Sequence, residues 1–566
     1  MITFPLFRSG RVRQLAAPLG LCLALALFFP VCACAQTAAE IDQPAGNRGR
    51  IVLVLPFDNR TGQPSMEWIR EASAEILRNR LASAGFAPMS RADRMYALDH
   101  LGLPQGFHPS RASSLKLAET LDADSIIVGS YVTDGSGIVA EAQLVDVPHL
   151  RMSQPVSARG EMRDLLSVFN TLAWKLTRQL DPDFNVAEET FVAASSGMRL
   201  DAFEQYIRGI TEPDQAERLR HLNSAVVLNP QFSQAWMALG REDYAGQQYE
   251  QAALAFAKVG RNGSDALEAG FYRGLSLLFS GDYAHAEEAF AEVARVLPLA
   301  AVLNNQGVAL ARRGKDGIPL FRQAAAADPN GADYHFNLAI SLKRHGDAAE
   351  ALAELAQCLR LRPSDGEAQA VQKAWTETAK PGAAKAPVVP PAAGAEKPGE
   401  AKEEVEARVD PLERIERNFD AAAFRQAAQM MDQINASRLA ALPPSERAQK
   451  FSAQAKEYLD RGLLLEAERL YLGAVAADSR VAAAHAGLAE VRERTGDADA
   501  ARKEATASLE LMPSVDAYLV LGRLDLAVGH LYEAKHELDE ALKIDPKSNT
   551  ALELQRKIEV GEGQKK

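Results

Sequence analysis

The sequence predicts an α+β head domain, a mixed sheet with helices, followed by two all-α solenoid arrays. A β-branched run and an alternating hairpin pattern near the start predict the sheet. A pattern of small and large residues then recurs at a period of about 34 residues, which predicts stacked helix pairs. One stretch rich in Ala, Pro, Lys and Glu interrupts that pattern and divides it into two arrays. A chain of 566 residues is long enough for about three or four domains.

Residues 1–35 have the composition of an export signal. Arg8, Arg11 and Arg13 form a basic start, an apolar stretch follows, and "ACAQ" predicts cleavage before Gln36. A second interpretation is a lipoprotein signal in which "VCAC" carries lipid on Cys34. A third interpretation is an uncleaved anchor, that is, a signal segment that stays attached to the chain. No later stretch of the sequence is long and apolar enough to span a bilayer. We therefore expect a periplasmic or cell-envelope location, with an outer-membrane lipoprotein as the alternative.

Residues 50–182 have the mixed order of strands and helices expected of the head. "RIVLVLPFD" predicts a buried strand, and the helical pattern that follows it ends at Gly85. "SSLKLAETLDA" predicts a shorter helix, and the next stretch predicts a hairpin that turns around Asp134 to Gly137. "MRDLLSVFNTLAWKLTRQL" closes the head with an amphipathic helix. Such an order produces a small sheet covered by helices.

Three stretches of the head resemble the TolB amino-terminal-like domain of bacterial envelope proteins. They are "VLPFDNRTG", "LDADSIIVGS" and "AQLVD". The Trp-containing strand expected after "AQLVD" is missing, which leaves the edge of the sheet open. The resemblance implies a periplasmic binding or assembly module, and it brings no catalytic residues.

Residues 197–376 and 410–560 contain the repeated pattern. Gly240, Gly274 and Gly307 follow one another at intervals of 34 and 33 residues. Small residues such as Gly274 and Ala286 mark places where two helices nearly touch, and large ones such as Phe290 fill the space beside them. This pattern resembles the tetratricopeptide repeat. The stretch around Tyr206 resembles a divergent first unit, and the stretch containing Phe424 and Ala427 resembles a degenerate one.

The interruption, residues 377–409, has almost nothing apolar to bury, so we expect a disordered linker there. The formal net charge of −12 disfavours a general nucleic-acid-binding protein. Cys358 is the single cysteine beyond the signal region, which excludes an internal disulfide in the exported domains.

The sequence lacks the common catalytic motifs: phosphate loop, dinucleotide fingerprint, serine elbow, HExxH and CxxC. Asp122 and Asp124 are better explained as residues at the end of a helix and the start of a strand than as a pair of metal ligands. We therefore expect no enzymatic activity, no catalytic or metal-binding residues and no cofactor.

Two repeats carry asparagine at the position that faces the concave groove, namely Asn305 and Asn337. Seven residues further on, the same two units carry Arg312 and Arg344. The asparagines resemble the asparagine ladder and carboxylate clamp of peptide-binding tetratricopeptide proteins. An amide both donates to and accepts from a peptide backbone, and a guanidinium can pair with a carboxylate. The alternative is that all four are polar groove residues without a ligand.

These observations predict an exported, non-enzymatic scaffold that binds other envelope proteins or extended peptides, without nucleic acid or a transmembrane span. Membrane association is expected only if Cys34 is lipidated. The competing prediction is a structural or assembly component that docks on an outer-membrane secretion or cell-wall machine.

Overall fold

A computed structural model describes residues 51–104, 106, 110–135, 137–193, 197–260, 265–378 and 411–563. The predicted signal segment and nearly all of the predicted linker therefore lie outside the described residues. Within the described ranges, no helix has both the length and the apolar character needed to cross a membrane.

The head contains the predicted mixed sheet. Strand β1 (Ile51–Val54) pairs in parallel with β3 (Ala87–Pro88) and β4 (Ser125–Asp134), while β2 (Asp58–Asn59) also pairs in parallel with β4. β4 forms the predicted hairpin with β5 (Gly137–Asp146), and Asp134 lies opposite Gly137 at its turn. β6 (Arg151–Met152) and β7 (Val156–Glu161) both pair antiparallel with β5. β7, which contains no Trp, therefore pairs with β5 at the sheet edge for which the sequence analysis predicted no strand.

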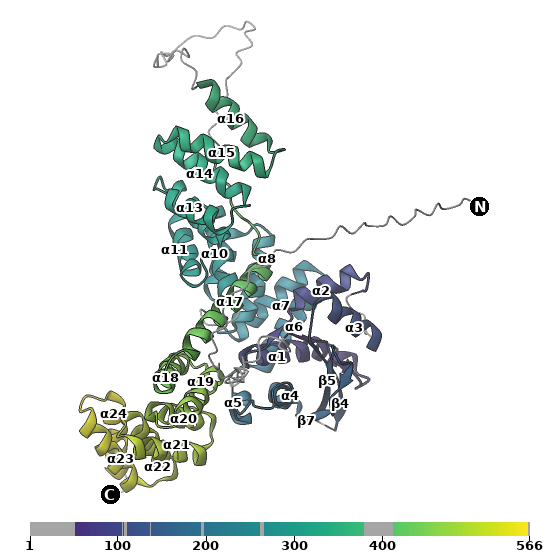
Figure 1. Cartoon of the computed structure of the whole chain (residues 1–566). Helices are drawn as coiled ribbons and strands as arrows, with labels where there is room; N and C mark the ends of the chain where they lie inside the picture. The colour runs from purple at the N-terminus through teal and green to yellow at the C-terminus, as the bar shows by residue number, and fades with distance from the viewer. Residues whose placement is uncertain are drawn as a thin grey trace, which may run out of the picture. The chain divides into compact units, whose positions relative to one another are not determined.

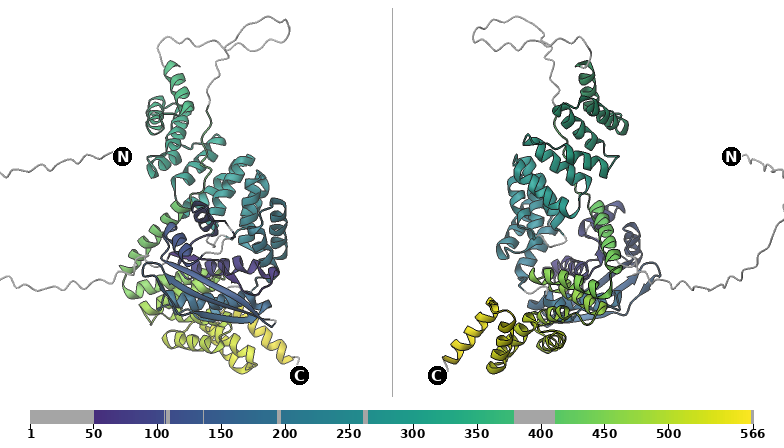
Figure 2. Two further views of the ribbon diagram at one scale, coloured as in Figure 1. Left: turned by 90° about the vertical axis from the view of Figure 1, so that its right-hand side faces the viewer. Right: turned by 60° about the vertical axis from the view of Figure 1, so that its left-hand side comes forward.

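The strands of the head are drawn as arrows in Figure 2. Alternation along β1 directs its side chains into two separate cores. Val52 and Val54 belong to a core with helices α1 (Trp68–Ser83) and α4 (Leu165–Leu180). Leu53 and Leu55 face the opposite side, where α2 (Arg91–His100) and α3 (Arg111–Thr120) cover the sheet. Both faces of the sheet are therefore covered by helices. Two 3-10 turns, η1 (Pro64–Met66) and η2 (Met162–Asp164), precede α1 and α4.

The core shared by α1 and α4 continues into the first helices of the array. Tyr206 and Phe232 belong to the same buried cluster as the sheet, and the Tyr206 hydroxyl lies 3.2 Å from a carboxylate oxygen of Glu75 on α1. Short helix α5 (Glu188–Ala193) lies between the head and this first unit. The divergent first unit is thus packed as an extension of the head.

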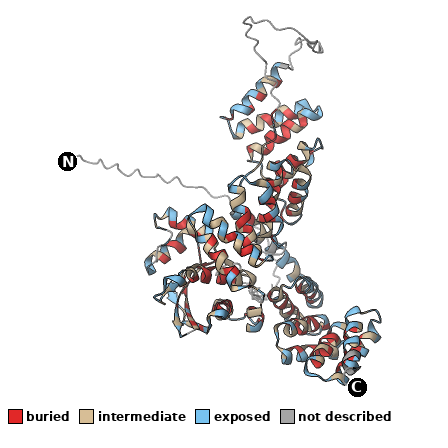
Figure 3. Ribbon diagram, turned by 180° about the vertical axis from the view of Figure 1, so that it is seen from behind, coloured by how far each residue is buried: buried red, intermediate tan, exposed pale blue. Residues whose placement is uncertain are grey.

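Antiparallel helix pairs follow, as the repeat pattern predicted (Figure 1). At Gly274, an added Cβ would lie 2.7 Å from the Phe290 ring, so a side chain there would require the ring to move. Gly281 ends the first helix of that pair at φ 84°, a backbone conformation that favours glycine. Buried residues lie on the facing sides of the helices and exposed residues on their outer sides (Figure 3).

The first array is formed by α6 (Leu200–Thr211), α7 (Gln215–Leu228), α8 (Ser233–Ala245), α9 (Tyr249–Ala257), α10 (Ala266–Ser280), α11 (Tyr283–Val296), α12 (Ala300–Arg312), α13 (Ile318–Ala327), α14 (Ala332–His345), α15 (Ala348–Leu361) and α16 (Gly366–Thr378). The second is formed by α18 (Pro444–Asp460), α19 (Leu464–Ala477), α20 (Ala482–Thr495), α21 (Ala498–Leu511), α22 (Val515–Val528), α23 (Leu531–Ile544) and α24 (Asn549–Gly563).

The stretch that resembled a degenerate repeat is not a helix pair. It forms one continuous helix, α17 (Ala421–Ala440). Phe424, near its start, is buried in the core of the first array beside Phe271. The chain from Pro411 to Phe424, which the sequence assigned to the second array, therefore contacts the first.

Candidate peptide-binding groove

Residues 411–419, here called the groove segment, run across the helices that carry the predicted site residues. The segment begins beside Arg344 on α14, where the Pro411 carbonyl accepts a hydrogen bond of 2.8 Å from Nη2. It ends beside α10, where the Phe419 and Phe271 ring centroids are 5.7 Å apart. The chain itself thus provides a peptide that occupies the groove.

The two predicted asparagines bind the backbone of alternate residues of this segment. Asn337 donates from Nδ2 to the Arg414 carbonyl at 2.7 Å and accepts from the Arg414 N–H at 2.6 Å. Asn305 makes the same pair of bonds with residue 416, at 2.7 and 2.9 Å. An extended chain presents the backbone of every second residue to the same side. The spacing of the two asparagines therefore matches an extended peptide.

A third asparagine links the other two. Asn304 donates to the Arg414 carbonyl at 3.0 Å and accepts from Nδ2 of Asn337 at 2.8 Å. All three side chains are buried, because the groove segment covers them. Burial of an amide is costly unless its donors and acceptors are paired. The bonds to the segment backbone and the bonds among the three amides together satisfy that requirement.

The two predicted arginines meet on a single carboxylate of the groove segment. Glu413 is almost fully buried and forms ion pairs with Arg312, at 3.1 Å, and with Arg344. Arg312 also donates to the Glu413 carbonyl at 3.2 Å. The arginines thus contact an internal glutamate of the segment.

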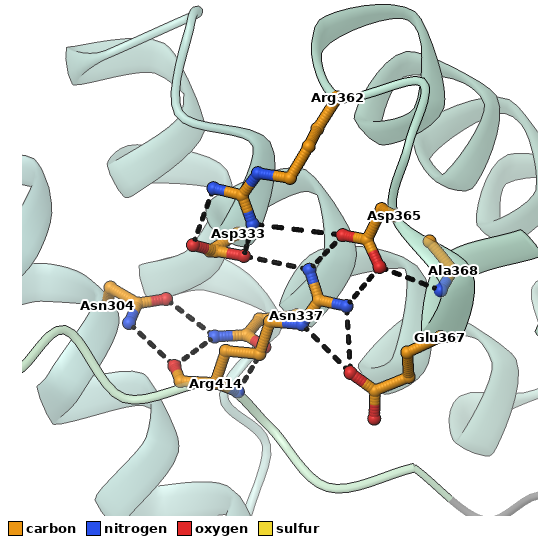
Figure 4. Close-up of polar contacts among 8 residues, drawn as sticks. All are labelled: Asn304, Asp333, Asn337, Arg362, Asp365, Glu367, Ala368 and Arg414. Atoms are coloured by element: carbon orange, nitrogen blue, oxygen red, sulfur yellow. Dashed lines mark hydrogen bonds and ion pairs between the residues drawn. The ribbon is translucent and has the colours of Figure 1, made fainter.

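The next residue, Arg414, points into a pocket that the sequence analysis did not identify (Figure 4). Its guanidinium carbon lies 3.5 Å from the centroid of the Phe336 ring. Its nitrogens donate to Asp333 at 2.8 Å, to Asp365 at 2.6 and 2.9 Å, and to Glu367 at 2.8 Å. The pocket therefore combines a cation–π contact with three carboxylates.

The carboxylates of this pocket respond electrostatically to the bound arginine. The hydrogen bond from Arg414 is the main cause that lowers the pKa of Asp365 below its ordinary value. For Asp333, burial would raise the pKa, but hydrogen bonds from Arg362 and Arg414 lower it. Both carboxylates are therefore ionised while the segment is bound.

Apolar contacts anchor the last part of the segment. Phe419 packs against Phe271 and, at a ring-centroid distance of 4.1 Å, against Phe424 at the start of α17. Ile415 is half-buried on the same core, whereas Leu412 is 58% exposed. Polar contacts therefore dominate the first half of the segment and apolar contacts the second.

The structure brings together all four residues that the repeat register selected: Asn305, Asn337, Arg312 and Arg344. Sequence reasoning missed Asn304, the arginine pocket and the groove segment. One available signal was the sequence "PLERIERNF", whose Leu412, Ile415 and Phe419 follow a stretch that is almost free of large apolar residues. Whether the groove binds a partner peptide stays a prediction.

Comparison with known families identifies repeats in both arrays. A tetratricopeptide repeat model matches residues 271–317, 312–366 and 452–514. These ranges include the helices that carry Asn305 and Asn337. No curated protein matches the chain.

Several solved structures resemble parts of the chain. MamA from Desulfovibrio magneticus RS-1 has 21% identity and a TM-score of 0.27, over 30% of this chain and 99% of that one. YrrB, described as "a TPR protein with an unusual peptide-binding site", has 16% identity and a TM-score of 0.27, over 36% and 99%. The LpoB C-terminal domain from Escherichia coli has 23% identity and a TM-score of 0.19, over 21% and 87%. No residue role is carried over from them.

Proposed function

We propose that this protein, which contains tetratricopeptide repeats, is an exported, non-enzymatic scaffold of the bacterial cell envelope. Its first array binds extended peptide segments of other envelope proteins. One observation carries the proposal. Asn305 binds both the N–H and the carbonyl of residue 416, and Asn337 binds both of these groups of residue 414. Such pairing holds an extended chain whatever its side chains are.

The export and envelope parts of the proposal rest on the sequence. The basic, apolar and small-residue order of the start favours a cleaved signal, and the head resembles the TolB amino-terminal-like domain. The non-enzymatic part rests on the absence of the common catalytic motifs from the sequence.

A second candidate is a structural or assembly component that docks on an outer-membrane secretion or cell-wall machine. The observation that favours it is "VCAC", which would place a lipid anchor on Cys34. Mass spectrometry of the mature N-terminal peptide separates the two. A peptide that begins at Gln36 supports the first, a lipidated Cys34 supports the second, and an intact Met1 on most molecules contradicts export.

The binding function is tested by capture from solubilised envelopes, with the mature chain as bait. We expect Asn305→Ala/Asn337→Ala to lose partners that the unaltered chain retains. The matched control is Asn223→Ala, because Asn223 is exposed and bonds only to its own helix at Leu219. The proposal is wrong if the double variant and the control capture the same proteins in the same amounts.

A further inference from the structure

The arginine pocket is a binding site in its own right, formed by three parts of the first array. Phe336 and Asp333 lie on α14, Asp365 lies in the loop before α16, and Glu367 lies in the first turn of α16. Asp365 is fixed independently of the groove segment, because it accepts a hydrogen bond of 3.0 Å from the Ala368 N–H. The walls of the pocket therefore belong to the array and not to the segment that fills it.

The charge of the pocket is incomplete without a cation from outside the array. Three carboxylates line it, namely Asp333, Asp365 and Glu367, and the array itself supplies Arg362, which pairs with Asp333 at 2.8 Å and lies 3.7 Å from Asp365. Formally, three negative charges face one positive charge. Partly buried carboxylates without a cation are unfavourable. The bound Arg414 guanidinium reduces that excess.

A site with the opposite charge, formed by two arginines, lies beside the arginine pocket. Arg312 and Arg344 face the carboxylate of Glu413, which is the residue before Arg414. Side chains of consecutive residues in an extended chain point to opposite sides. The groove thus offers a cationic site and an anionic site on the two sides of one backbone, in the order that accepts a glutamate followed by an arginine.

We propose that the groove segment is a built-in ligand, and that partner peptides with the same core displace it. The core is a glutamate, an arginine and an apolar residue in extended conformation, within a chain and not at a carboxyl terminus. The arginine is recognised by Phe336, Asp333, Asp365 and Glu367, and this inference rests on the proposed function. Bound to its own segment, the first array is closed to partners.

Tethering explains why the segment excludes a weak competitor. Residues 379–410 join it to the end of α16, so it binds within the same chain at an effective concentration on the order of 1 mM. A free peptide with a dissociation constant of about 10 µM would then bind the unaltered chain roughly a hundredfold more weakly than an empty groove. A partner that makes further contacts overcomes this difference.

The test uses a fluorescein-labelled synthetic peptide with the sequence of residues 411–419 and the full mature chain. Glu413→Ala/Arg414→Ala weakens the chain's own segment and leaves every groove residue intact. By fluorescence anisotropy, we expect this variant to bind the peptide about a hundredfold more tightly than the unaltered chain. Arg414→Lys alone keeps the charge but loses the forked hydrogen bonds, so it should produce a smaller gain. Circular dichroism verifies that each variant is folded.

Specificity is tested in the opened variant. Adding Asp365→Asn should weaken peptide binding at least tenfold, because the carboxylate that receives two of the arginine bonds is lost. Adding Asp201→Asn is the matched control, since Asp201 is an exposed carboxylate whose ion pair with Arg199 lies outside the groove. Equal losses in the two variants would overturn the assignment of the arginine pocket.

The outcomes separate this inference from the proposed function. If the opened variant and the unaltered chain bind the peptide equally well, the built-in ligand is wrong but the groove still binds peptides. If neither the opened variant nor the unaltered chain binds it, the peptide-binding function itself is wrong. A dimeric unaltered chain that the peptide converts to monomers would mean that a second copy donates the segment, and would overturn occupation within one chain.

Discussion

Removing the two asparagine amides is the perturbation whose effect follows most directly from the geometry. Asn305→Ala/Asn337→Ala deletes four hydrogen bonds of 2.6 to 2.9 Å to the groove segment. A net contribution of about 1 kcal/mol for each bond gives about 4 kcal/mol. The equilibrium for docking of the segment should then shift by roughly a thousandfold. The helix pairs should stay folded, because these amides bond to the segment and to the side chain of Asn304.

Hydrogen exchange detected by mass spectrometry measures this shift. The backbone N–H groups of Arg414 and Glu416 are the donors to the two asparagines. With a docked-to-open ratio of roughly a hundred in the unaltered chain, the shift removes this protection, so the peptide that contains them should exchange roughly a hundredfold faster in the double variant. Protection in α10, α12 and α14 should change little. Asn223→Ala is again the control and should leave the exchange unaltered. The groove assignment is refuted if residues 411–419 exchange at the same rate in the double variant and in the unaltered chain.

Three further results are expected. Brief proteolysis should cut within residues 379–408. The two fragments should still co-elute in gel filtration at concentrations well above about 10 µM, because the groove segment still binds the first array without its tether; fragments that separate at such concentrations would contradict the docking. Gly274→Val should lower the free energy of unfolding by about 1–3 kcal/mol, through overpacking against the facing ring, whereas Gly366→Ala, with open space beside it, should have little effect in a denaturant titration. Docking should also weaken in acid. The bound Arg414 lowers the pKa of Asp365, so this stabilisation is complete above the ordinary aspartate pKa of about 3.9 and is lost as the pH falls through the lower bound value. Exchange of the segment, corrected for intrinsic rates, should reveal that step. Asp365→Asn should reduce it and leave the part due to Asp333, whose pKa Arg414 also lowers.

Local patterns predicted most of the fold. The hairpin around Asp134 to Gly137 and the helix pair containing Gly274 depend on neighbours in the sequence, and both form as expected. Strand β7 was missed because "VSARGE" buries only Ala158, so it lacks the apolar alternation of a strand. Its position is determined by pairing with β5.

The occupied groove shows why half of the site was predicted and half was not. Asn305 and Asn337 followed from the repeat register, which determines the face of the helix on which a residue lies. Their ligand did not, because Glu416 is 111 residues away from Asn305 and no periodic pattern connects the two. The arginine pocket joins side chains from α14 and α16 to a segment beyond the linker, a juxtaposition that only the folded chain reveals.

The central claim is that residues 411–419 occupy the groove as a displaceable ligand, and a competition experiment tests it most directly. An isotopically labelled peptide of the same sequence is added in excess to the unaltered chain, and hydrogen exchange is measured in the chain's own segment. We predict that exchange of this segment accelerates as the peptide concentration rises through the millimolar range, while a peptide with alanine in place of the glutamate and arginine of the core has no effect. Unchanged protection of the segment at saturating peptide would contradict the account.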